Sequence, residues 1–337
     1  MNNLKKIGVS ALAGSLVAVA ANAGELSVSG SANLTYTNED LSNSASTPSN
    51  STGNPFGSAS DVSFSGSGDV NGMTVSFFAA IDAGGGSYAS NSFSVDMGDM
   101  GKIRFDQGVG GNGAAAIDDK SPTAWEESWD GIAAGVGLTM TGSQNVFEYE
   151  NTIGGFGVAV AWDTEIDDSR TADGATGAQG TSIDGSNTSF AITNASLVDG
   201  LDFGVGMSET DVKDGTTTST DIETVVGYAN YTVGPVTFGY TQGETSGGAK
   251  GHDMHQMEAY GIVFAVNENL SVSYNNHEVT YAKTSGNVDQ SSDKDGIAIA
   301  YSMGGASVKI QNNTTDGSST ANTYQEDRTE VNLSLAF

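Results

Sequence analysis

The chain contains no cysteine among its 337 residues, so it can form neither disulfide bonds nor thiolate metal sites. Proline is almost as scarce, at 4 residues, which argues against a proline-rich linker. Positive charge is also low, since 12 Lys and Arg face 41 Asp and Glu, for a formal net charge of −29. Such a chain has no basic surface with which to neutralise phosphates, so nucleic acid is excluded as a partner.

Long apolar runs are confined to the N-terminus. Lys5 and Lys6 precede an apolar stretch over 7–20, and Ala21-Asn22-Ala23 follows as a small-residue cleavage site. This pattern predicts a cleaved secretory signal peptide over 1–23 and a mature protein over 24–337. A retained membrane anchor is disfavoured because the apolar run is too short to span comfortably.

The mature sequence instead shows apolar and polar residues in strict alternation. At the C-terminus, Val331, Leu333, Leu335 and Phe337 share one parity, and polar residues fill the other. Alternation of this kind predicts half-buried β-strands. It recurs over 26–36, 62–64, 73–81, 93–97, 103–105, 147–149, 156–162, 190–192, 201–207, 236–240, 260–264, 270–274, 297–303 and 308–310. Two segments are less clear: 221–233 fits either parity, and 270–281 changes register near His277.

The connections between these segments alternate between short and long. Short joins lie near 69–72, 98–101, 152–155, 197–200, 233–235, 266–269 and 303–305. Long polar stretches cover 37–60, 83–90, 107–144, 165–185, 210–220, 243–254, 283–294 and 314–324. This arrangement predicts an all-β fold, a closed antiparallel up-and-down barrel of about 16 strands with long external loops and short periplasmic turns.

Closure of the sheet would pair every backbone N–H and C=O, which is the condition for a position in hydrocarbon. The apolar parity would then face lipid and the polar parity would face water, because barrels of about this size enclose an aqueous channel. We therefore expect the polar residues of the strands to be the functional surface.

Five stretches resemble the general diffusion porins of Gram-negative bacteria, of the trimeric 16-stranded, alphaproteobacterial type. They are "GELSVSGSANLTYT", "VSFSGSGDVNGMTVSFFAAID", "SFSVDMGDMGKIRF", "AAAIDDKSPTAWEESWD" and the terminal "VNLSLAF". The resemblance implies a homotrimer in the outer membrane, in contact with lipid and lipopolysaccharide. It also implies that Phe337 is a signal for the barrel assembly machinery.

The same resemblance implies that the third long loop, 107–144, folds into the barrel and constricts it. This loop contains Trp125 and Trp129, which could wedge it against the wall; the alternative is an external loop whose tryptophans lie in an interfacial belt. Its acidic residues are the expected constriction carboxylates: Asp118, Asp119, Glu126, Glu127 and Asp130.

Basic residues are expected on the wall opposite that loop. Alternation directs Lys102, Arg104, Lys309 and Arg328 into the lumen, because a cation on the lipid face near the midplane costs roughly 2–4 kcal/mol. The same parity predicts lumen carboxylates at Asp82, Asp96, Glu148, Glu150 and Asp202. With only three arginines in the chain, anion selectivity is disfavoured, and the carboxylates predict weak cation selectivity.

No catalytic set is recognised, so an enzyme is not expected, and no cofactor is implied. "VGGNGAAA" lacks the lysine of a phosphate loop, and the three histidines show no metal-binding spacing. Weak calcium binding by acidic loops such as 165–173 stays open.

The expected function is an open pore for ions and small hydrophilic solutes. The alternatives are a substrate-specific outer-membrane channel and a secreted structural or adhesive β-protein. The latter would show a fixed-length repeat, which this sequence lacks.

Overall fold

The computed structural model describes residues 26–43, 53–82, 88–132, 138, 140, 145–163, 184–212, 219–249, 254–282, 290–318 and 323–337. The expected signal peptide at 1–23 and the acidic loop at 165–173 lie outside these residues. No helix in the described part of the chain is both long and apolar enough to cross a membrane.

Within the described residues the chain forms sixteen strands and two short 3-10 turns. The strands are β1 (Leu26–Asn43), β2 (Phe56–Val70), β3 (Met73–Asp82), β4 (Tyr88–Asp96), β5 (Lys102–Gln107), β6 (Val146–Ile153), β7 (Phe156–Asp163), β8 (Asp184–Asn194), β9 (Leu201–Val212), β10 (Ser219–Val233), β11 (Val236–Ala249), β12 (Met254–Ala265), β13 (Leu270–Ala282), β14 (Gln290–Met303), β15 (Ala306–Ser318) and β16 (Thr323–Ala336). The 3-10 turns are η1 (Gly98–Met100) and η2 (Gly113–Ala116).

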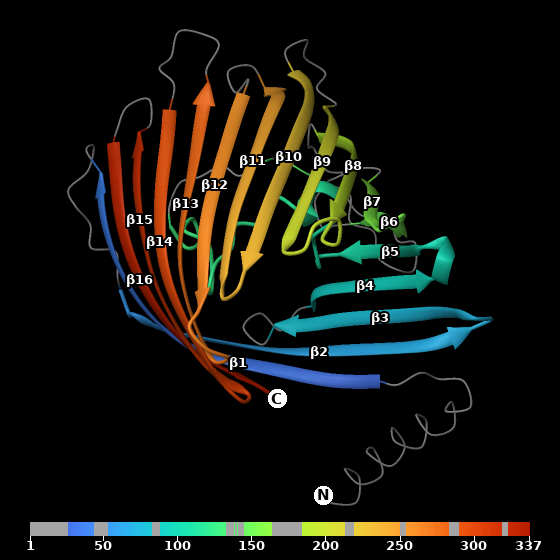
Figure 1. Cartoon of the computed structure of the whole chain (residues 1–337), viewed down its shortest axis with the longest axis horizontal. Coiled ribbons are helices and arrows are strands. Elements are labelled where there is room, and N and C mark those ends of the chain that lie inside the picture. Colours follow the sequence, from blue (N-terminus) through green and yellow to red (C-terminus); the bar gives the residue numbers. More distant parts are fainter. Residues whose placement is uncertain are drawn as a thin grey trace, which may run out of the picture.

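Each strand pairs antiparallel with its neighbours in sequence, and β16 pairs with β1 to close the barrel. Figure 1 shows the first and last strands side by side. Leu34 lies opposite Leu333 across this seam, and Tyr36 lies opposite Val331. The Phe337 N–H donates to the Gly30 carbonyl at 2.9 Å, and the Gly30 N–H donates back at 2.7 Å. The C-terminal stripe is therefore one side of the closing seam, and the predicted closed 16-stranded barrel is confirmed.

The short connections are tight turns at one end of the barrel. Asn71 and Gly72 join β2 to β3 with φ of 55° and 80°, a left-handed pair that suits the twist of a two-residue hairpin. The Gly72 N–H donates to the Asp69 carboxylate at 3.1 Å. The strand ends that the long connections join lie at the other end of the barrel, called here the long-loop end.

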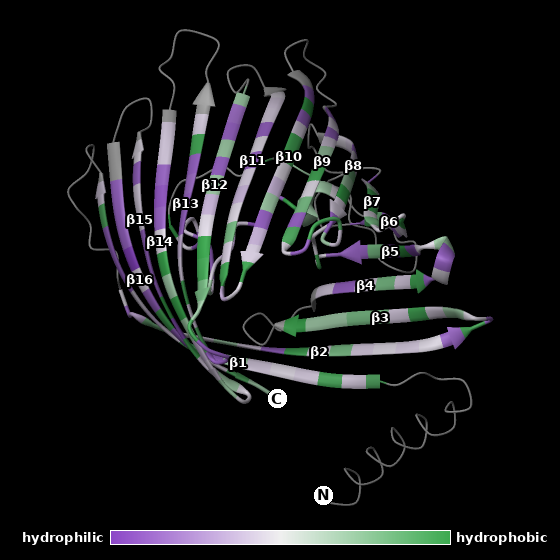
Figure 2. Ribbon diagram, in the orientation of Figure 1, coloured by the Kyte–Doolittle hydropathy of each residue, from purple (hydrophilic) through white to green (hydrophobic). Residues whose placement is uncertain are grey.

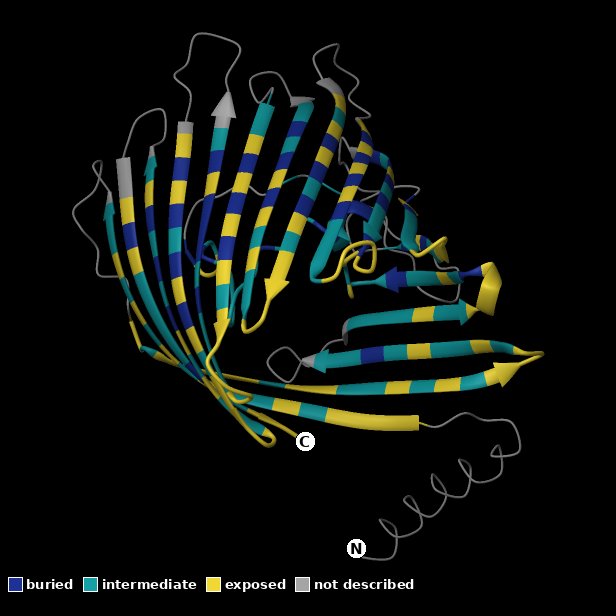
Figure 3. Ribbon diagram, viewed as in Figure 1, coloured by how far each residue is buried: buried dark blue, intermediate teal, exposed yellow. Residues whose placement is uncertain are grey.

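The outer face carries the apolar residues of each strand. Exposed and buried residues alternate along β10 to β15, as Figure 3 shows. On β14, for example, Ile299 is 40% exposed, whereas Ala298 beside it is 2% exposed. Figure 2 shows that the apolar residues gather toward the short-turn ends of β13 to β16, and that the long-loop ends are more polar.

Two strands differ from the expectation drawn from sequence. β13 pairs with β12 and β14 without a register shift, so alternation does not change near His277. Its outward positions beyond Tyr274 are simply polar, as at Glu278. On β10, Val226 and Tyr228 face inward although they are apolar, because the interior beneath them is filled by protein.

A charge placed in the middle of the outward band tests whether lipid covers it. We expect Ile299→Arg to lower the free energy of unfolding by about 2–4 kcal/mol, because an arginine near the midplane loses its hydration. Met303→Arg, at the short-turn end of the same face, should cost only about 0–1 kcal/mol. The measurement is reversible unfolding from lipid vesicles; equal costs at the two sites would contradict lipid exposure of this band.

Candidate functional site: a loop held inside the barrel

The segment after β5 turns into the barrel and lies against its inner wall. The Ala114 N–H at the start of η2 donates to the Ser189 hydroxyl of β8 at 2.7 Å. Ala114 and Ile117 then form a buried cluster with three wall residues, Ala191, Val226 and Tyr228. This packing explains why β10 has apolar residues on both faces.

From η2 the loop continues along the inner faces of the later strands. Its backbone is held by polar side chains of the wall in chain order. Asn230 of β10 donates to the Lys120 carbonyl at 2.8 Å, and the Ala124 N–H donates to Ser273 of β13 at 2.8 Å. Beyond these contacts, Gln311 of β15 donates to the Glu127 carbonyl at 2.9 Å. The loop thus spans the interior from β8 to β15.

Glycines on the inner wall make room for this path. A Cβ built at Gly239 or Gly261 would overlap Pro122 of the loop, and one at Gly206 would lie 2.9 Å from Ala114 Cβ. None of these three glycines has a positive φ, so space for the loop, and not backbone conformation, requires them. Sequence reasoning missed this set, although glycine at inward parity on successive strands is a readable signal.

The two tryptophans of the loop contact the wall. The Trp129 ring lies 4.3 Å from the His277 ring of β13, measured between centroids. The Lys309 Nζ of β15 lies 5.7 Å from the centre of the Trp125 ring. Both rings are therefore inside the barrel and not in an outer aromatic belt.

A buried ion pair fixes the root of the loop. Arg104 of β5 donates to Glu148 Oε2 of β6 from Nε at 3.0 Å and from Nη2 at 2.6 Å. The same Nη2 donates to Asn112 Oδ1 at 2.7 Å, and Glu148 Oε1 accepts the Gly113 N–H at 2.8 Å. Asp106 accepts the N–H groups of the intervening turn, including that of Gly110 at 2.8 Å. Asp106 and Asn112, which sequence reasoning missed, are therefore positioning residues of the loop.

The loop carries five carboxylates and one lysine, a formal charge of −4. Asp119 and Glu127 share a side-chain hydrogen bond, and so do Glu126 and Asp130. Burial raises the pKa of Glu126 to about 8, with a further rise from Asp130, and burial together with Asp119 raises the pKa of Glu127 to about 8. Burial and the Asp119 charge raise the pKa of Asp118 to about 6, and burial also raises the pKa of Asp119.

The predicted basic residues do face inward, and three of the four contact the loop. Arg104 binds the loop root, Lys309 lies over Trp125, and Arg328 donates to the Gly131 carbonyl and to Glu330. Lys102 pairs with Glu150 at 3.1 Å. Lys309 and Arg328 meet the loop where it crosses to β15 and β16. The field between the acidic loop and a basic wall stays a prediction.

The predicted lumen carboxylates have different environments. Glu148 is 1% exposed and paired with Arg104, so it is a structural residue and not a free lumen charge. Glu150 is paired with Lys102, and Asp202 accepts the Tyr228 hydroxyl at 2.8 Å. Asp96 lies exposed at the end of β4, while the side chain of Asp82 lies outside the described part of the structure.

One group of described residues has ligand atoms close enough together for a metal ion. Carboxylate oxygens of Glu209, Asp211 and Asp221 lie within 4.8 Å of one another on β9 and β10. All three are exposed, and exposed acidic groups cluster without an ion as well. His277 does not belong to this group, because its ring lies inside the barrel against the ring of Trp129.

Known proteins resemble this chain in structure and not in sequence. No family model and no curated protein matches the chain. Solved structures do match. One described as a refined porin structure has a TM-score of 0.63 at 17% identity, over 93% of this chain and 100% of that one. The chain has the porin fold.

Two further porin-fold structures show the same extent of similarity. The anion-selective porin from Comamonas acidovorans has a TM-score of 0.63 at 13% identity, over 93% of this chain and 100% of that one. The trimer form of OmpT, an outer membrane protein of Vibrio cholerae, has a TM-score of 0.59 at 13% identity, over 94% and 100%.

Removal of Arg104 tests the role of the loop root. We expect Arg104→Ala to lower the free energy of unfolding by about 3–5 kcal/mol, because it leaves the Glu148 carboxylate buried without its cation. Lys102→Ala breaks an ion pair that is 37% and 40% exposed, and should cost about 0–1 kcal/mol. Urea unfolding in detergent measures both; similar losses would mean that the Arg104 pair has no special role.

A methyl group at Gly261 tests the path of the loop. Gly261→Ala should destabilise the barrel by about 1–3 kcal/mol, because the new Cβ overlaps the Pro122 backbone. Gly227→Ala is the control, since its Cβ would lie on the outer face, 3.4 Å from the nearest atom. A change within about 0.5 kcal/mol is expected there. The measurement is thermal unfolding. If both variants unfold at the temperature of the unchanged protein, Pro122 does not lie against Gly261.

Proposed function

We propose that this chain forms a water-filled channel in a bacterial outer membrane, through which ions and small hydrophilic solutes diffuse passively. The observation that carries the proposal is the acidic loop held inside a closed barrel whose outer face is apolar. A polar interior behind an apolar wall is what a diffusion channel needs, and the loop lies inside that interior.

A weak preference for cations is part of the proposal. Each of the four predicted wall cations already contacts a carboxylate, a loop carbonyl or a tryptophan ring. The loop, in contrast, carries more acidic than basic residues. Carboxylates that line a constriction attract cations and repel anions. The fold alone does not set this preference, because the Comamonas protein with the same fold is described as anion-selective.

We also propose an assembly state and a route of export. The chain forms a homotrimer, which the trimer form of the Vibrio protein supports. Export by a cleaved signal peptide, insertion by the barrel assembly machinery through Phe337, and contact with lipopolysaccharide complete the proposal. A secreted solenoid is disfavoured because the sheet closes on itself.

Planar bilayer recordings with the purified protein test the channel directly. With potassium chloride more concentrated on one side, a cation-preferring pore makes the dilute side positive at zero current. Stable open conductance with that sign is the expected result. A negative potential on the dilute side would overturn the cation preference, and no conductance would overturn the channel itself.

The loop acids also predict a pH dependence. Since the pKa values of Glu126 and Glu127 are raised to about 8, both groups are largely neutral below pH 7 and become negative as pH rises past 8. The ratio of cation to anion permeability should therefore rise by roughly a factor of two or more between pH 6 and pH 9, because added carboxylates within a Debye length concentrate cations.

Two variants distinguish the titration of Glu126 and Glu127 from the loss of a negative charge elsewhere in the protein. Glu126→Gln with Glu127→Gln should flatten the pH profile between pH 7 and pH 9. Asp199→Asn, in the turn between β8 and β9, removes one charge far from the loop and should leave the profile unchanged. A profile that survives in the glutamine variant would assign the titration to other groups.

A further inference from the structure

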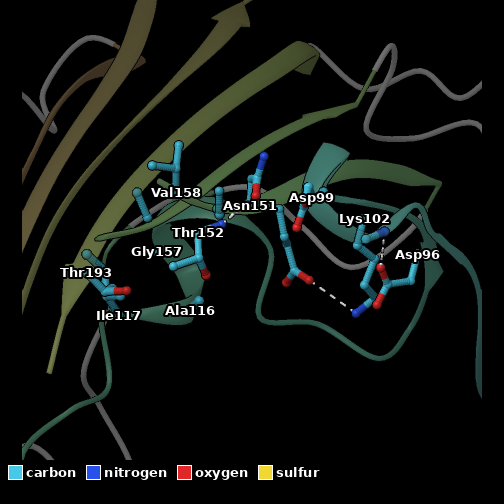
Figure 4. Close-up of a pocket in the computed structure, with 16 residues that line it drawn as sticks. Asp96, Asp99, Lys102, Ala116, Ile117, Asn151, Thr152, Gly157, Val158 and Thr193 are labelled. Carbon is cyan, nitrogen blue, oxygen red and sulfur yellow. Dashed lines mark hydrogen bonds and ion pairs between the residues drawn. The ribbon is translucent and has the colours of Figure 1, made fainter. Parts of the chain in front are cut away.

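A cavity of about 750 Å³ opens on the inner wall at the short-turn side of the loop. Ala116 and Ile117 of the loop lie on one side of it, and residues of β4 to β8 and of the turn between β4 and β5 form the rest (Figure 4). It is distinct from the carboxylates of the loop, because Asp118, Asp119, Glu126, Glu127 and Asp130 are not among its lining residues.

Small residues create this space. Glu150 of β6 lies opposite Ala159 of β7, and Ala159 lies opposite Ala191 of β8, so two neighbouring inward positions carry only methyl groups. Gly157 lines the next inward position of β7. A cavity of this volume is in the range that binds small organic molecules.

The charges in the cavity are unbalanced. Lys102 is committed to Glu150, at 3.1 Å. Asp96 and Asp99 also line the cavity, and in the described part of the chain neither forms an ion pair. The Asp96 carboxylate is held in place, because its Oδ1 accepts the Gly98 N–H at 2.9 Å. Lys102 lies opposite Asp96 in the register of β4 and β5, so the lining carries three carboxylates and one ammonium group, a formal charge of −2.

The other side of the cavity carries the apolar residues Ala116, Ile117 and Ala159, with the polar Thr193 beside them. Ile117 is 1% exposed and anchored in the cluster beneath the loop, and Ala116 packs against the same cluster. A solute in this cavity would therefore meet carboxylates on one side and methyl groups on the other, which favours a molecule with a charged end and an apolar body.

We propose that this cavity is a binding site for cationic organic solutes, namely primary amines with an apolar body. The ammonium group binds at the end of the cavity that Asp96 and Asp99 line, and the apolar body lies against Ala116 and Ala159. The site deepens the proposed channel function, on which it rests: amines that enter the barrel are held on the short-turn side of the loop before they leave. Anionic solutes are disfavoured there, because the lining carries a net negative charge.

Open-channel recordings with three probes test this site. The probes are 2-phenylethylamine, its neutral isostere 2-phenylethanol, and ammonium chloride, each titrated on the short-turn side. The amine should reduce the open-channel current saturably at a concentration at least about tenfold lower than either control, since it alone combines charge and apolar body.

The matched variants are Asp96→Asn with Asp99→Asn, against Asp69→Asn. Asparagine keeps an oxygen to accept the Gly98 N–H, so the turn is preserved in the first variant. Asp69 lies at the same end of the barrel and likewise accepts a glycine N–H, from Gly72, but does not line the cavity. The double variant should raise the half-blocking amine concentration about tenfold, and Asp69→Asn should leave both this concentration and the amine-free conductance unchanged.

Four outcomes would overturn the site. They are block by the alcohol as strong as by the amine, block by ammonium alone at the same concentration, an equal effect of Asp69→Asn, and no shift in the double variant. Should the protein form no channel, the proposed function fails. Calorimetric titration of 2-phenylethylamine into the detergent-solubilised protein then decides the site separately, with the same double variant as its control.

Discussion

The rest of this structure depends on one constraint: in lipid hydrocarbon, every backbone N–H and C=O group must find its hydrogen-bond partner within the protein. A sheet with a free edge would leave a row of N–H and C=O groups unpaired in hydrocarbon, so the sixteen strands must close. Closure is completed by the last residues of the chain, where Phe337 and Gly30 exchange two backbone hydrogen bonds. Once the ring is closed, each residue must face either lipid or the interior, and the two-residue period of the strands sorts apolar from polar side chains accordingly.

A closed barrel has no hydrophobic core at its centre on which a loop could pack. The loop after β5 is held inside by three kinds of contact with the wall. A buried ion pair holds its root, a small apolar cluster holds η2, and hydrogen bonds from wall side chains hold its backbone between 120 and 131. Because wall side chains bind loop carbonyls, the loop acids can crowd together and share protons. Burial in this position, and then the neighbouring acids, raise the pKa values of Glu126 and Glu127.

Much of the fold could be predicted from sequence because alternation and turn length are local properties. The barrel, its strand number and the outward parity of residues such as Ile299 all follow from them. β10 was ambiguous for a physical reason: Val226 and Tyr228 are apolar because a distant segment packs on them, and no local pattern records that segment. The partners of the basic residues could not be read from sequence either. The alternation along the strands predicts that Arg104 and Arg328 face inward, and they do. It does not predict whether an inward cation contacts water, a carboxylate or a loop carbonyl.

The central claim is that successive residues of one strand face lipid and water in turn. The absence of cysteine allows a direct measurement, because single cysteines at Asn33, Leu34, Thr35 and Tyr36 of β1 can each carry a nitroxide in the protein reconstituted into lipid vesicles. Collision with oxygen, which concentrates in lipid, should be high at 34 and 36, and collision with a water-soluble nickel complex should be high at 33 and 35. A profile without this two-residue period, or protection of all four positions from both reagents, would contradict the account.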